Sequence, residues 1–372
     1  MLRTKVGEIP QMDTLQTTST QMNSNQPNSL QPTGRGPSIL DIAREAQVSP
    51  ATVSRVLNGT ARVKGDKAQR VLEVVDRLSF KLNSNTFARN LLAGRLRAIG
   101  VIIPVLHDEF FGTIITGIEE RLRAGGVHLL CALGQENGDE ELIALETILK
   151  GRPDGVIAFA DWLPDAPLIE LERSGVPVVL LNRSVPELAR HCLRLDNELG
   201  GLLATEHLLE LGHRRIAHVT GSFDRLDVRE RYAGYHAALR KAGVVPEEAL
   251  ELTGVWAEEI EGGRAAVKRL SQRTTFTAVF AANDWLALGV VQGLRDLGLR
   301  VPEDVSVVGF DNRRVTELSA PALTVIDFPR LEMGHLAAEH LLSLLDGLIT
   351  PPLPLLTPRL IVRASTTRPP AA

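Results

Sequence analysis

A stretch near the N-terminus, VSPATVSRVLN (48–58), places small side chains ahead of a single long cation. Ser49 is a favourable helix N-cap, and Pro50 suits the first helical position because no N–H is needed there. An apolar stripe recurs at helical spacing, formed by Val53, Val56 and Leu57. Arg55 lies on the opposite, polar face, and its guanidinium has the bidentate geometry that reads guanine. The small residues would let such a helix approach DNA closely.

The flanking segments complete a small helical unit. SILDIAREA (38–46) predicts a short helix, joined to the next one by only a few residues. Two short helices with a tight turn are the plan of a helix-turn-helix. Residues 66–80 predict a third helix, whose inward-facing residues are expected to be Val71, Leu72, Val75 and Leu78. The pattern alone also fits an ordinary helical hairpin with a solvated charged face.

Charge distinguishes these two interpretations. Residues 37–97 hold 11 Lys and Arg against 5 Asp and Glu, which gives +6, whereas the whole chain is −4. A basic head on an acidic body is expected when only the head meets a polyanion. Nucleic-acid binding by residues 37–82 is therefore the favoured interpretation.

Bulk composition excludes several classes of protein. The chain has 372 residues and is 44% hydrophobic and 23% charged, which suits two or three globular domains. It has no apolar run long enough for a membrane span and no signal peptide, so we expect a cytoplasmic protein. Cys131 and Cys192 are expected to be buried free thiols. Residues 1–36 are polar, rich in Gln, Ser, Thr and Pro, and expected to be disordered.

Motifs for catalysis and metal binding are missing from the sequence. It contains no GxSxG and no GxGxxG, and GTIITG (112–117) lacks the lysine of a phosphate-binding loop. The histidines show no metal-ligand spacing, and His213 is interpreted as structural. We expect neither an enzyme nor a cofactor nor a metal site.

From Ala98 onward, apolar runs alternate with helical periodicity. The predicted strands lie at 98–104, 127–132, 154–160, 176–182, 214–221, 277–283 and 305–312. This alternation predicts an α/β body of two doubly wound, mainly parallel subdomains. Ligands of such sheets bind at the carboxyl ends of the strands, so a cleft between two subdomains is the expected binding site.

Several stretches together resemble the LacI/GalR family of transcription regulators. They are SILDIAREAQVSPATVSRVLNG, ARNLLAG, AIGVIIP, LDNELGGLLATEHLLELGHRRIAHVTG, VRERYAGYHAAL, AANDWLALGVVQGLRDLGLRVPEDVSVVGFDN and PRLIVRAST. The resemblance covers roughly residues 37–366 and implies a helix-turn-helix head on a periplasmic-binding-protein-like body.

The resemblance also implies a division of the chain. The DNA-binding domain would span 37–82, the hinge helix 83–97, and the effector-binding and dimerisation domain 98–372. Within the body, the N-subdomain would comprise 98–194 and 328–350. The C-subdomain would comprise 195–325 and 352–366.

Roles at the DNA follow from the same resemblance. Family members place the second helix in the major groove, so Pro50, Ala51 and Arg55 would meet bases while Ser49 and Thr52 approach phosphates. Ile39 would contact the backbone at the start of the first helix, and Asn58 lies on the same polar face as Arg55. The resemblance further implies that a homodimer binds a palindromic operator.

ARNLLAG (88–94) resembles the hinge helix of the family. Leu91 would wedge into a central base step from the minor groove, beside Arg89. The alternative is an ordinary linker leucine. The chain departs from the family pattern here, because KLNSNTF lacks the usual proline and is about two residues longer.

The resemblance places the effector in the cleft. The residues implied to contact it are Phe110, Phe111, Asn182, Arg183, Asp227, Arg231, Trp256, Asn283 and Asp311. Amide, carboxylate and guanidinium groups beside aromatic faces suit a sugar or related polyol. The alternatives are loop packing for the phenylalanines and a strand-end salt-bridge network for Arg231, Asn283 and Asp311.

We expect a DNA-binding repressor of a carbohydrate-utilisation operon, released by a sugar-like effector. A corepressor-dependent regulator of the same family is the alternative. A sugar-binding transport protein fits less well, because it needs a signal peptide and no basic head.

Overall fold

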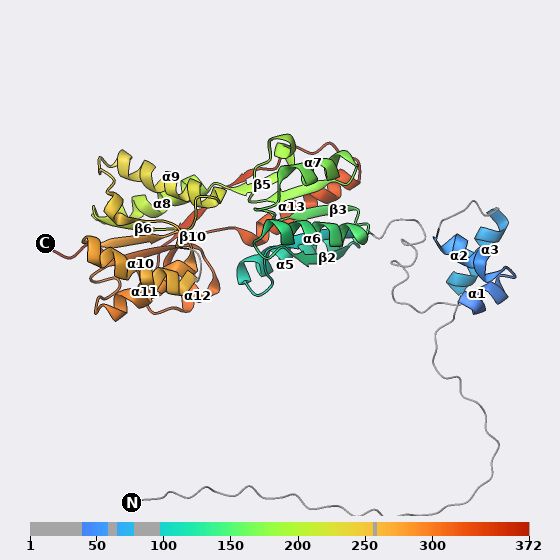
Figure 1. Ribbon diagram of the computed structural model, residues 1–372, viewed down its shortest axis with the longest axis horizontal. Helices are drawn as coiled ribbons and strands as arrows, with labels where there is room; N and C mark the ends of the chain where they lie inside the picture. The colour runs from blue at the N-terminus through green and yellow to red at the C-terminus, as the bar shows by residue number, and fades with distance from the viewer. Residues whose placement is uncertain (1–38, 59–64, 78–96, 256–258, 372) are drawn as a thin grey trace, which may run out of the picture. The chain divides into compact units, whose positions relative to one another are not determined.

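The computed structural model describes residues 39–58, 65–77, 97–255 and 259–371. They form two compact units, a helical head and an α/β body, shown in Figure 1. The head consists of α1 (Ile39–Glu45), α2 (Pro50–Asn58) and α3 (Gly65–Arg77). The tail 1–36, nearly all of the hinge 83–97 and Trp256 lie outside the described residues.

The head has a small core of aliphatic side chains. Its buried members are Ile42, Ala43, Ala46, Val53, Val71 and Val74. The inward face predicted for α3 was partly wrong, because Leu72 is 43% exposed and Val74 is buried in its place. Val71 and Val74 are three residues apart and therefore lie on the same face of the helix. Leu72 directly follows Val71 and therefore points to a different side.

The body begins with a six-stranded sheet in the order β11-β5-β4-β3-β1-β2. Its strands are β1 (Ala98–Ile103), β2 (His128–Leu133), β3 (Gly155–Ala158), β4 (Val178–Leu181), β5 (Cys192–Leu195) and β11 (Leu355–Leu356). The helices of this lobe are α5 (Glu109–Ala124), α6 (Gly138–Lys150), α7 (Asp165–Arg173) and α13 (Arg330–Leu345), with a 3₁₀ turn η1 (Pro186–His191). We call this unit the N-terminal lobe.

A second six-stranded sheet has the order β12-β10-β9-β8-β6-β7. Its strands are β6 (Ile216–Val219), β7 (Glu251–Leu252), β8 (Ala278–Ala281), β9 (Ser306–Asp311), β10 (Thr324–Asp327) and β12 (Arg359–Ile361). The helices are α8 (Asn197–Glu210), α9 (Leu226–Lys241), α10 (Glu259–Arg273), α11 (Asp284–Asp296) and α12 (Arg314–Leu318), with a 3₁₀ turn η2 (Glu248–Leu250). We call this unit the C-terminal lobe.

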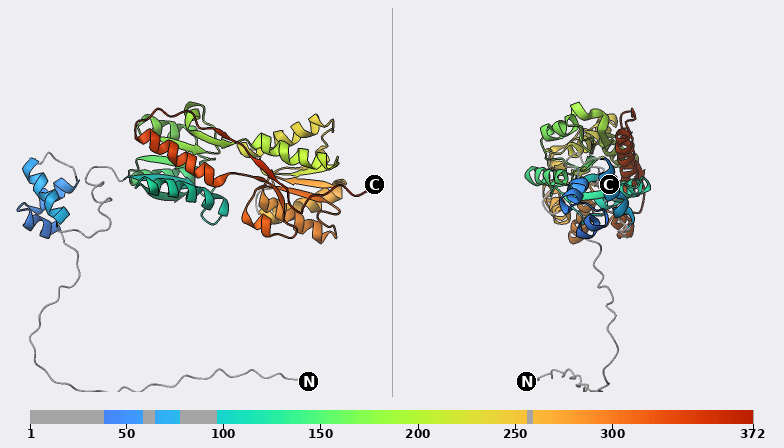
Figure 2. Two further views of the ribbon diagram at one scale, coloured as in Figure 1. Left: turned by 180° about the vertical axis from the view of Figure 1, so that it is seen from behind. Right: turned by 90° about the vertical axis from the view of Figure 1, so that its right-hand side faces the viewer.

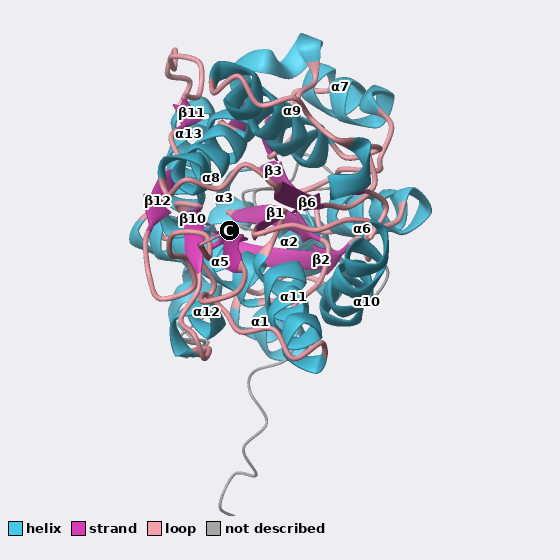
Figure 3. Ribbon diagram, turned by 90° about the vertical axis from the view of Figure 1, so that its left-hand side faces the viewer, coloured by secondary structure: helices cyan, strands magenta, loops and turns pink. Residues whose placement is uncertain are grey.

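The sheets confirm the predicted α/β fold class. Strand pairs are parallel in both sheets except β10 with β12, which is antiparallel. Strands β1, β3, β4, β6, β8 and β9 are buried along their whole length. Burial on both faces is why these strands appear in the sequence as continuous apolar runs rather than alternating ones. Figure 3 shows the helices surrounding the strands.

The chain passes between the lobes at three places, between β5 and α8, between β10 and α13, and between β11 and β12. Figure 2 shows the C-terminal part of the chain running from one lobe to the other. One predicted boundary differs from the structure. Segment 352–366 was assigned to the C-subdomain, but its β11 pairs with β5 in the N-terminal lobe. Only β12 reaches the second sheet, where it lies beside β10.

Close helix contacts set the position of α9 in the C-terminal lobe. A Cβ at Gly234 of α9 would lie 2.0 Å from the carbonyl oxygen of Glu198, and one at Gly201 of α8 would lie 2.2 Å from that of Arg231. Only glycine permits this approach of the two backbones. The contact determines where Arg231, on the same helix, enters the site.

Candidate functional site: a charged cleft and an exposed head helix

A cavity of about 60 Å³ lies between the lobes of the body, where strands of both sheets end. Its lining residues follow the carboxyl ends of those strands or begin the helices after them, the position expected for a ligand of doubly wound sheets. They are Asp108, Phe110, Phe111, Glu136, Phe159, Asp161, Asn182, Arg225, Asp227, Arg231, Asn283, Asp311 and Arg313.

Carboxylates and guanidiniums alternate through this cleft. Asp161 lies 3.6 Å from Arg225, which donates to Asp227 at 3.1 and 3.2 Å. Asp227 lies 3.7 Å from Arg231 on the next turn of α9, so each of these arginines has Asp227 as a neighbour. The cleft therefore carries a chain of opposite charges rather than a patch of one sign.

The chain continues into the second half of the cleft. Arg231 lies 3.6 Å from Asp311, which accepts from Arg313. Arg313 also reaches Asp108 with two hydrogen bonds of 3.0 and 2.9 Å. Asp108 belongs to the N-terminal lobe and Arg313 to the C-terminal lobe, so this ion pair crosses the cleft.

The charge chain shifts the pKa values of its carboxyl groups in opposite directions. Burial alone would raise the pKa of Asp227, but the charges of Arg225 and Arg231 outweigh it and lower that pKa to about 2. Burial dominates at Asp161 and raises its pKa to about 6, despite the opposing charge of Arg225. For Asp108, the hydrogen bonds and charge of Arg313 outweigh burial, and its pKa is lowered. Asp227 and Asp108 are thus ionised acceptors at neutral pH.

Aromatic rings form one wall of the cleft. Phe110 and Phe111 lie in the first turn of α5, and their rings meet edge to face with centroids 5.1 Å apart. Phe159, after β3, lies 5.2 Å from Phe111 in a similar geometry. Phe110 is only 8% exposed and also packs on Phe328, so it serves the core as well as the cavity. Such faces can stack on the C–H surface of a ligand.

Two strand ends in the cleft carry unusual backbone conformations. Asn182 after β4 has a φ of 55°, and Asp311 at the end of β9 has a φ of 100°. Left-handed backbone at residues other than glycine costs free energy and clusters at functional sites. Asn283 has a structural role too, because its side chain accepts from the N–H of Leu286 and caps α11.

The cleft can therefore offer acceptors, donors and apolar faces to one small molecule. Carboxylate oxygens accept hydrogen bonds, guanidiniums donate them, and a hydroxyl group does both. Within the described residues, no cluster of His, Cys, Asp and Glu side chains has the geometry to hold a metal ion.

Most residues implied by the resemblance line this cavity. They are Phe110, Phe111, Asn182, Asp227, Arg231, Asn283 and Asp311. Arg183 is not among the lining residues and instead donates to Asp165 and to the carbonyl of Ala160. The salt-bridge network considered for Arg231 and Asp311 is also present, so binding and structure share these side chains.

Sequence reasoning missed other lining residues. These are Asp108, Glu136, Phe159, Asp161, Arg225 and Arg313. A usable signal existed for several of them, because Asp108 and Asp161 closely follow predicted strands and Arg313 follows GFDN. The prediction for the cysteines was half correct, since Cys192 is buried but Cys131 is exposed.

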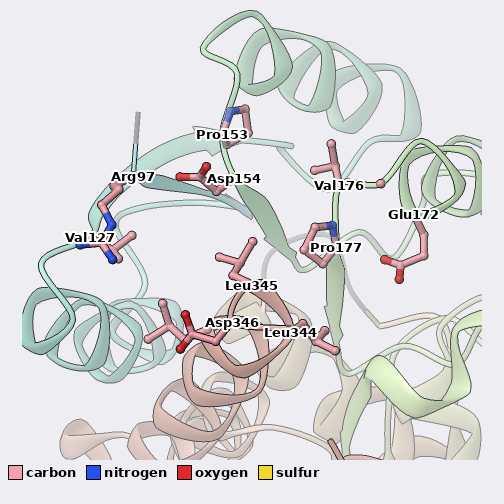
Figure 4. A pocket seen from close by; sticks show the side chains of 12 residues that line it. Arg97, Val127, Pro153, Asp154, Glu172, Val176, Pro177, Leu344, Leu345 and Asp346 are labelled. Carbon is pink, nitrogen blue, oxygen red and sulfur yellow. The ribbon is translucent and has the colours of Figure 1, made fainter. Parts of the chain in front are cut away.

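A larger cavity, of about 600 Å³, lies at the opposite end of the first sheet (Figure 4). It is lined by residues that precede β1, β3 and β4 and by the end of α13. Two of its three acidic residues have structural roles, because Asp154 accepts from the N–H of Ala98 at 3.1 Å and Glu172 from that of Val178 at 2.8 Å. The smaller cleft, with its convergent charges at the strand ends, is the better candidate for a ligand site.

The head presents the predicted face of α2 to solvent. Ser49, Pro50, Ala51 and Arg55 are exposed, and Thr52 is half-buried. Ser49 caps the helix as predicted, since its Oγ accepts from the N–H of Thr52 at 3.1 Å. Ile39 begins α1 and Asn58 ends α2, while Arg89 and Leu91 lie outside the described residues.

Known proteins are similar to this chain in both its head and its body. A family model for bacterial regulatory proteins of the lacI family matches residues 38–83, and one for a periplasmic binding protein-like domain matches 205–366. The transcriptional regulator GalR of Escherichia coli is 33% identical, over 89% of this chain and 96% of its own length. The chain belongs to the LacI/GalR family. Its head is therefore a helix-turn-helix and its body the effector domain of a DNA-binding transcriptional regulator, not an enzyme.

Other LacI/GalR members are similar along most of the chain. Catabolite control protein A of Priestia megaterium is 33% identical over 82% of this chain and 91% of its own length. The lac repressor dimer, solved bound to operator and an anti-inducer, superposes with a TM-score of 0.70 at 28% identity, covering 90% of this chain and all of that one. Among the described residues, none of the helices is long and apolar enough to cross a membrane.

Proposed function

We propose that this LacI/GalR member is a homodimeric repressor that binds a palindromic operator and is released by a neutral, sugar-like polyol. The observation that carries the effector class is the cleft, where ionised carboxylates, guanidiniums and phenylalanine rings converge. Such a site can donate hydrogen bonds to hydroxyl groups and accept hydrogen bonds from them. Its phenylalanine rings can stack on the C–H face of the sugar.

The relatives support this class of ligand. The regulator CelR is 32% identical, over 88% of this chain and 99% of its own, and was solved as a cellobiose complex. A LacI family regulator from Enterococcus faecium was solved with bound ribose. A regulator that acts on the chromosome works in the cytoplasm, where we place this chain.

Base reading is proposed for Pro50, Ala51 and Arg55, with Ser49 and Thr52 near phosphates. The exposure of this face supports these roles, because a recognition helix must present its reading side chains to solvent before it meets the groove. Ile39 and Asn58 complete the proposed contact surface on α1 and α2, with Arg89 and Leu91 proposed for the hinge.

The test is selection of binding sites from random duplex DNA by the purified chain, with and without a pooled library of neutral sugars. We expect an enriched palindrome of two half-sites that is lost when the right sugar is present. Enrichment that appears only with a sugar would replace release by the corepressor mechanism. No enriched sequence under either condition would contradict the DNA-binding role.

A further inference from the structure

One ion pair in the cleft joins the two lobes directly. Asp108 directly precedes α5 in the N-terminal lobe, and Arg313 follows β9 in the C-terminal lobe. The guanidinium of Arg313 approaches both carboxylate oxygens of Asp108, at 3.0 Å from Nε and 2.9 Å from Nη2. The side chains are only 14% and 6% exposed. A bidentate pair with this burial is among the stronger ionic contacts in proteins.

Both partners are held in place within their own lobes. Asp108 caps α5 by accepting from the N–H of Phe110 at 2.7 Å. Arg313 also pairs with Asp311, and its backbone N–H donates to Asp284 at 2.6 Å. The pair therefore joins two anchored groups, so its geometry reports the relative position of the lobes.

Two weaker contacts cross the same cleft. Asp161 of the N-terminal lobe lies 3.6 Å from Arg225 of the C-terminal lobe. The backbone N–H of Arg314 donates to the carboxylate of Glu109 at 3.2 Å. All three contacts require the lobes to be close together, and parting of the lobes breaks them.

The size of the cavity makes such parting necessary for a sugar. Pockets that bind small molecules typically measure about 300–1,000 Å³, whereas this cleft holds about 60 Å³. The chain crosses between the lobes at three short segments, which lets the lobes move as bodies about that line.

We propose that Asp108 and Arg313 form a latch that holds the cleft closed and against which the effector must compete. The inference rests on the proposed function of the cleft as the effector site, and it makes these two residues determinants of effector specificity. A ligand that replaces the latch must satisfy a buried carboxylate and a buried guanidinium together. Adjacent hydroxyl groups can do this and an apolar ligand cannot.

The substitution Asp108→Asn weakens the latch without disturbing the fold. Asparagine is nearly the same size and also caps helices, so the contact with the N–H of Phe110 is retained while the charge is lost. Arg313→Gln is the reciprocal change, although it also removes the ion pair between Arg313 and Asp311, which leaves Asp311 with Arg231 alone among the described residues. Arg314→Gln is the matched control, because that side chain is exposed and only its backbone contributes to the cleft.

The readout is the distance between the lobes in the full chain without DNA or sugar. Spin labels would be attached at Glu170→Cys on α7 and Lys268→Cys on α10, both exposed, in a Cys131→Ser background. Labelled chain would be diluted into excess unlabelled chain, so that distances within one chain dominate. Pulsed dipolar spectroscopy then gives the distance distribution, and thermal unfolding verifies that each variant is folded.

We expect a longer-distance population in Asp108→Asn that is weak or missing in the parent and in Arg314→Gln. The double variant Asp108→Asn/Arg313→Gln should open no further than the single variants, because both remove the same pair. A folded Asp108→Asn with the parental distribution would overturn the latch. Since the measurement uses neither operator nor effector, its result is independent of whether the DNA selection succeeds.

Discussion

At the scale of single residues, the proposed DNA contacts depend on one long side chain among short ones. Arg55 is exposed on α2, and its neighbours Pro50 and Ala51 are exposed as well. Alanine can touch a thymine methyl group but offers no hydrogen bond, so direct readout by hydrogen bonding rests on the guanidinium.

Arg55→Ala is therefore expected to remove the preference for one base pair in each half-site. The loss of discrimination should be ~1–3 kcal/mol at that position, as for a lost bidentate contact to guanine. Binding-site selection with the variant measures it directly. Lys67→Ala, an exposed change on α3, is the control and should leave the preference intact. Unchanged preference in Arg55→Ala would contradict the role.

At the scale of elements, the contact between α8 and α9 positions the charged side chains of α9. Gly234 and Gly201 bring the two backbones together, and Asp227 and Arg231 extend from α9 into the cleft. Helix packing and the binding site are thus linked through one interface.

Gly234→Ala should destabilise the body by ~1–3 kcal/mol, the usual cost of overpacking, because its methyl group would press on the carbonyl of Glu198. Urea unfolding measures this change. The matched control is Gly112→Ala in α5, where a Cβ meets nothing within 4 Å. That control should be neutral or more stable by up to ~1 kcal/mol, since alanine is the better helix former. Equal effects at the two positions would show that close packing is not the cause.

The hinge supplies a second prediction at this scale. Leu91 lies outside the described residues, and its role follows from the similarity of ARNLLAG to the family's hinge helix. A leucine that wedges into a base step contributes only where the operator bends, so Leu91→Ala should weaken specific binding with little effect on non-specific binding. Titration of operator and random duplex at one salt concentration distinguishes the two, and equal losses on both would refute the role.

At the scale of the whole molecule, one buried histidine couples stability to pH. His218 of β6 is fully buried, stacked between Tyr235 and Phe280, with Nδ1 2.9 Å from the carbonyl of Phe280. Burial lowers its pKa from 6.5 to about 3. Between these values the unfolded chain binds a proton that the folded chain does not, so stability falls as the pH drops below 6.5.

His218→Phe should remove this loss while keeping the stacked ring. Relative to the variant, the parent should lose about 2 kcal/mol between pH 6.5 and pH 5, at up to ~1.4 kcal/mol per pH unit. Urea unfolding of both proteins at the two pH values gives the comparison. Parallel losses in the two proteins would assign the acid sensitivity to other groups.

What could be predicted from the sequence was local. The caps and stripes of α1 and α2, and apolar runs such as AIGVIIP (98–104), are properties of neighbouring residues, so the helix pair and the buried strands were predicted correctly. Short strands were harder. Strands β5 and β10 were not predicted, because four residues carry too little periodicity to identify a strand. Leu72 of α3 was placed on the wrong face, where Val74 is buried instead.

The strand-end residues of the cleft were reached partly through the family resemblance, and the rest only through the tertiary structure. Asp108 and Arg313 are 205 residues apart in the chain, and no local pattern links them. Their pairing exists because strands of two different sheets end at one cleft. A buried charge without a partner costs free energy there, so each charged group is placed opposite one of the other sign. Composition and periodicity determined that this chain has a basic helical head and an α/β body. Only the packing of the two lobes decided which charges face each other across the ligand site.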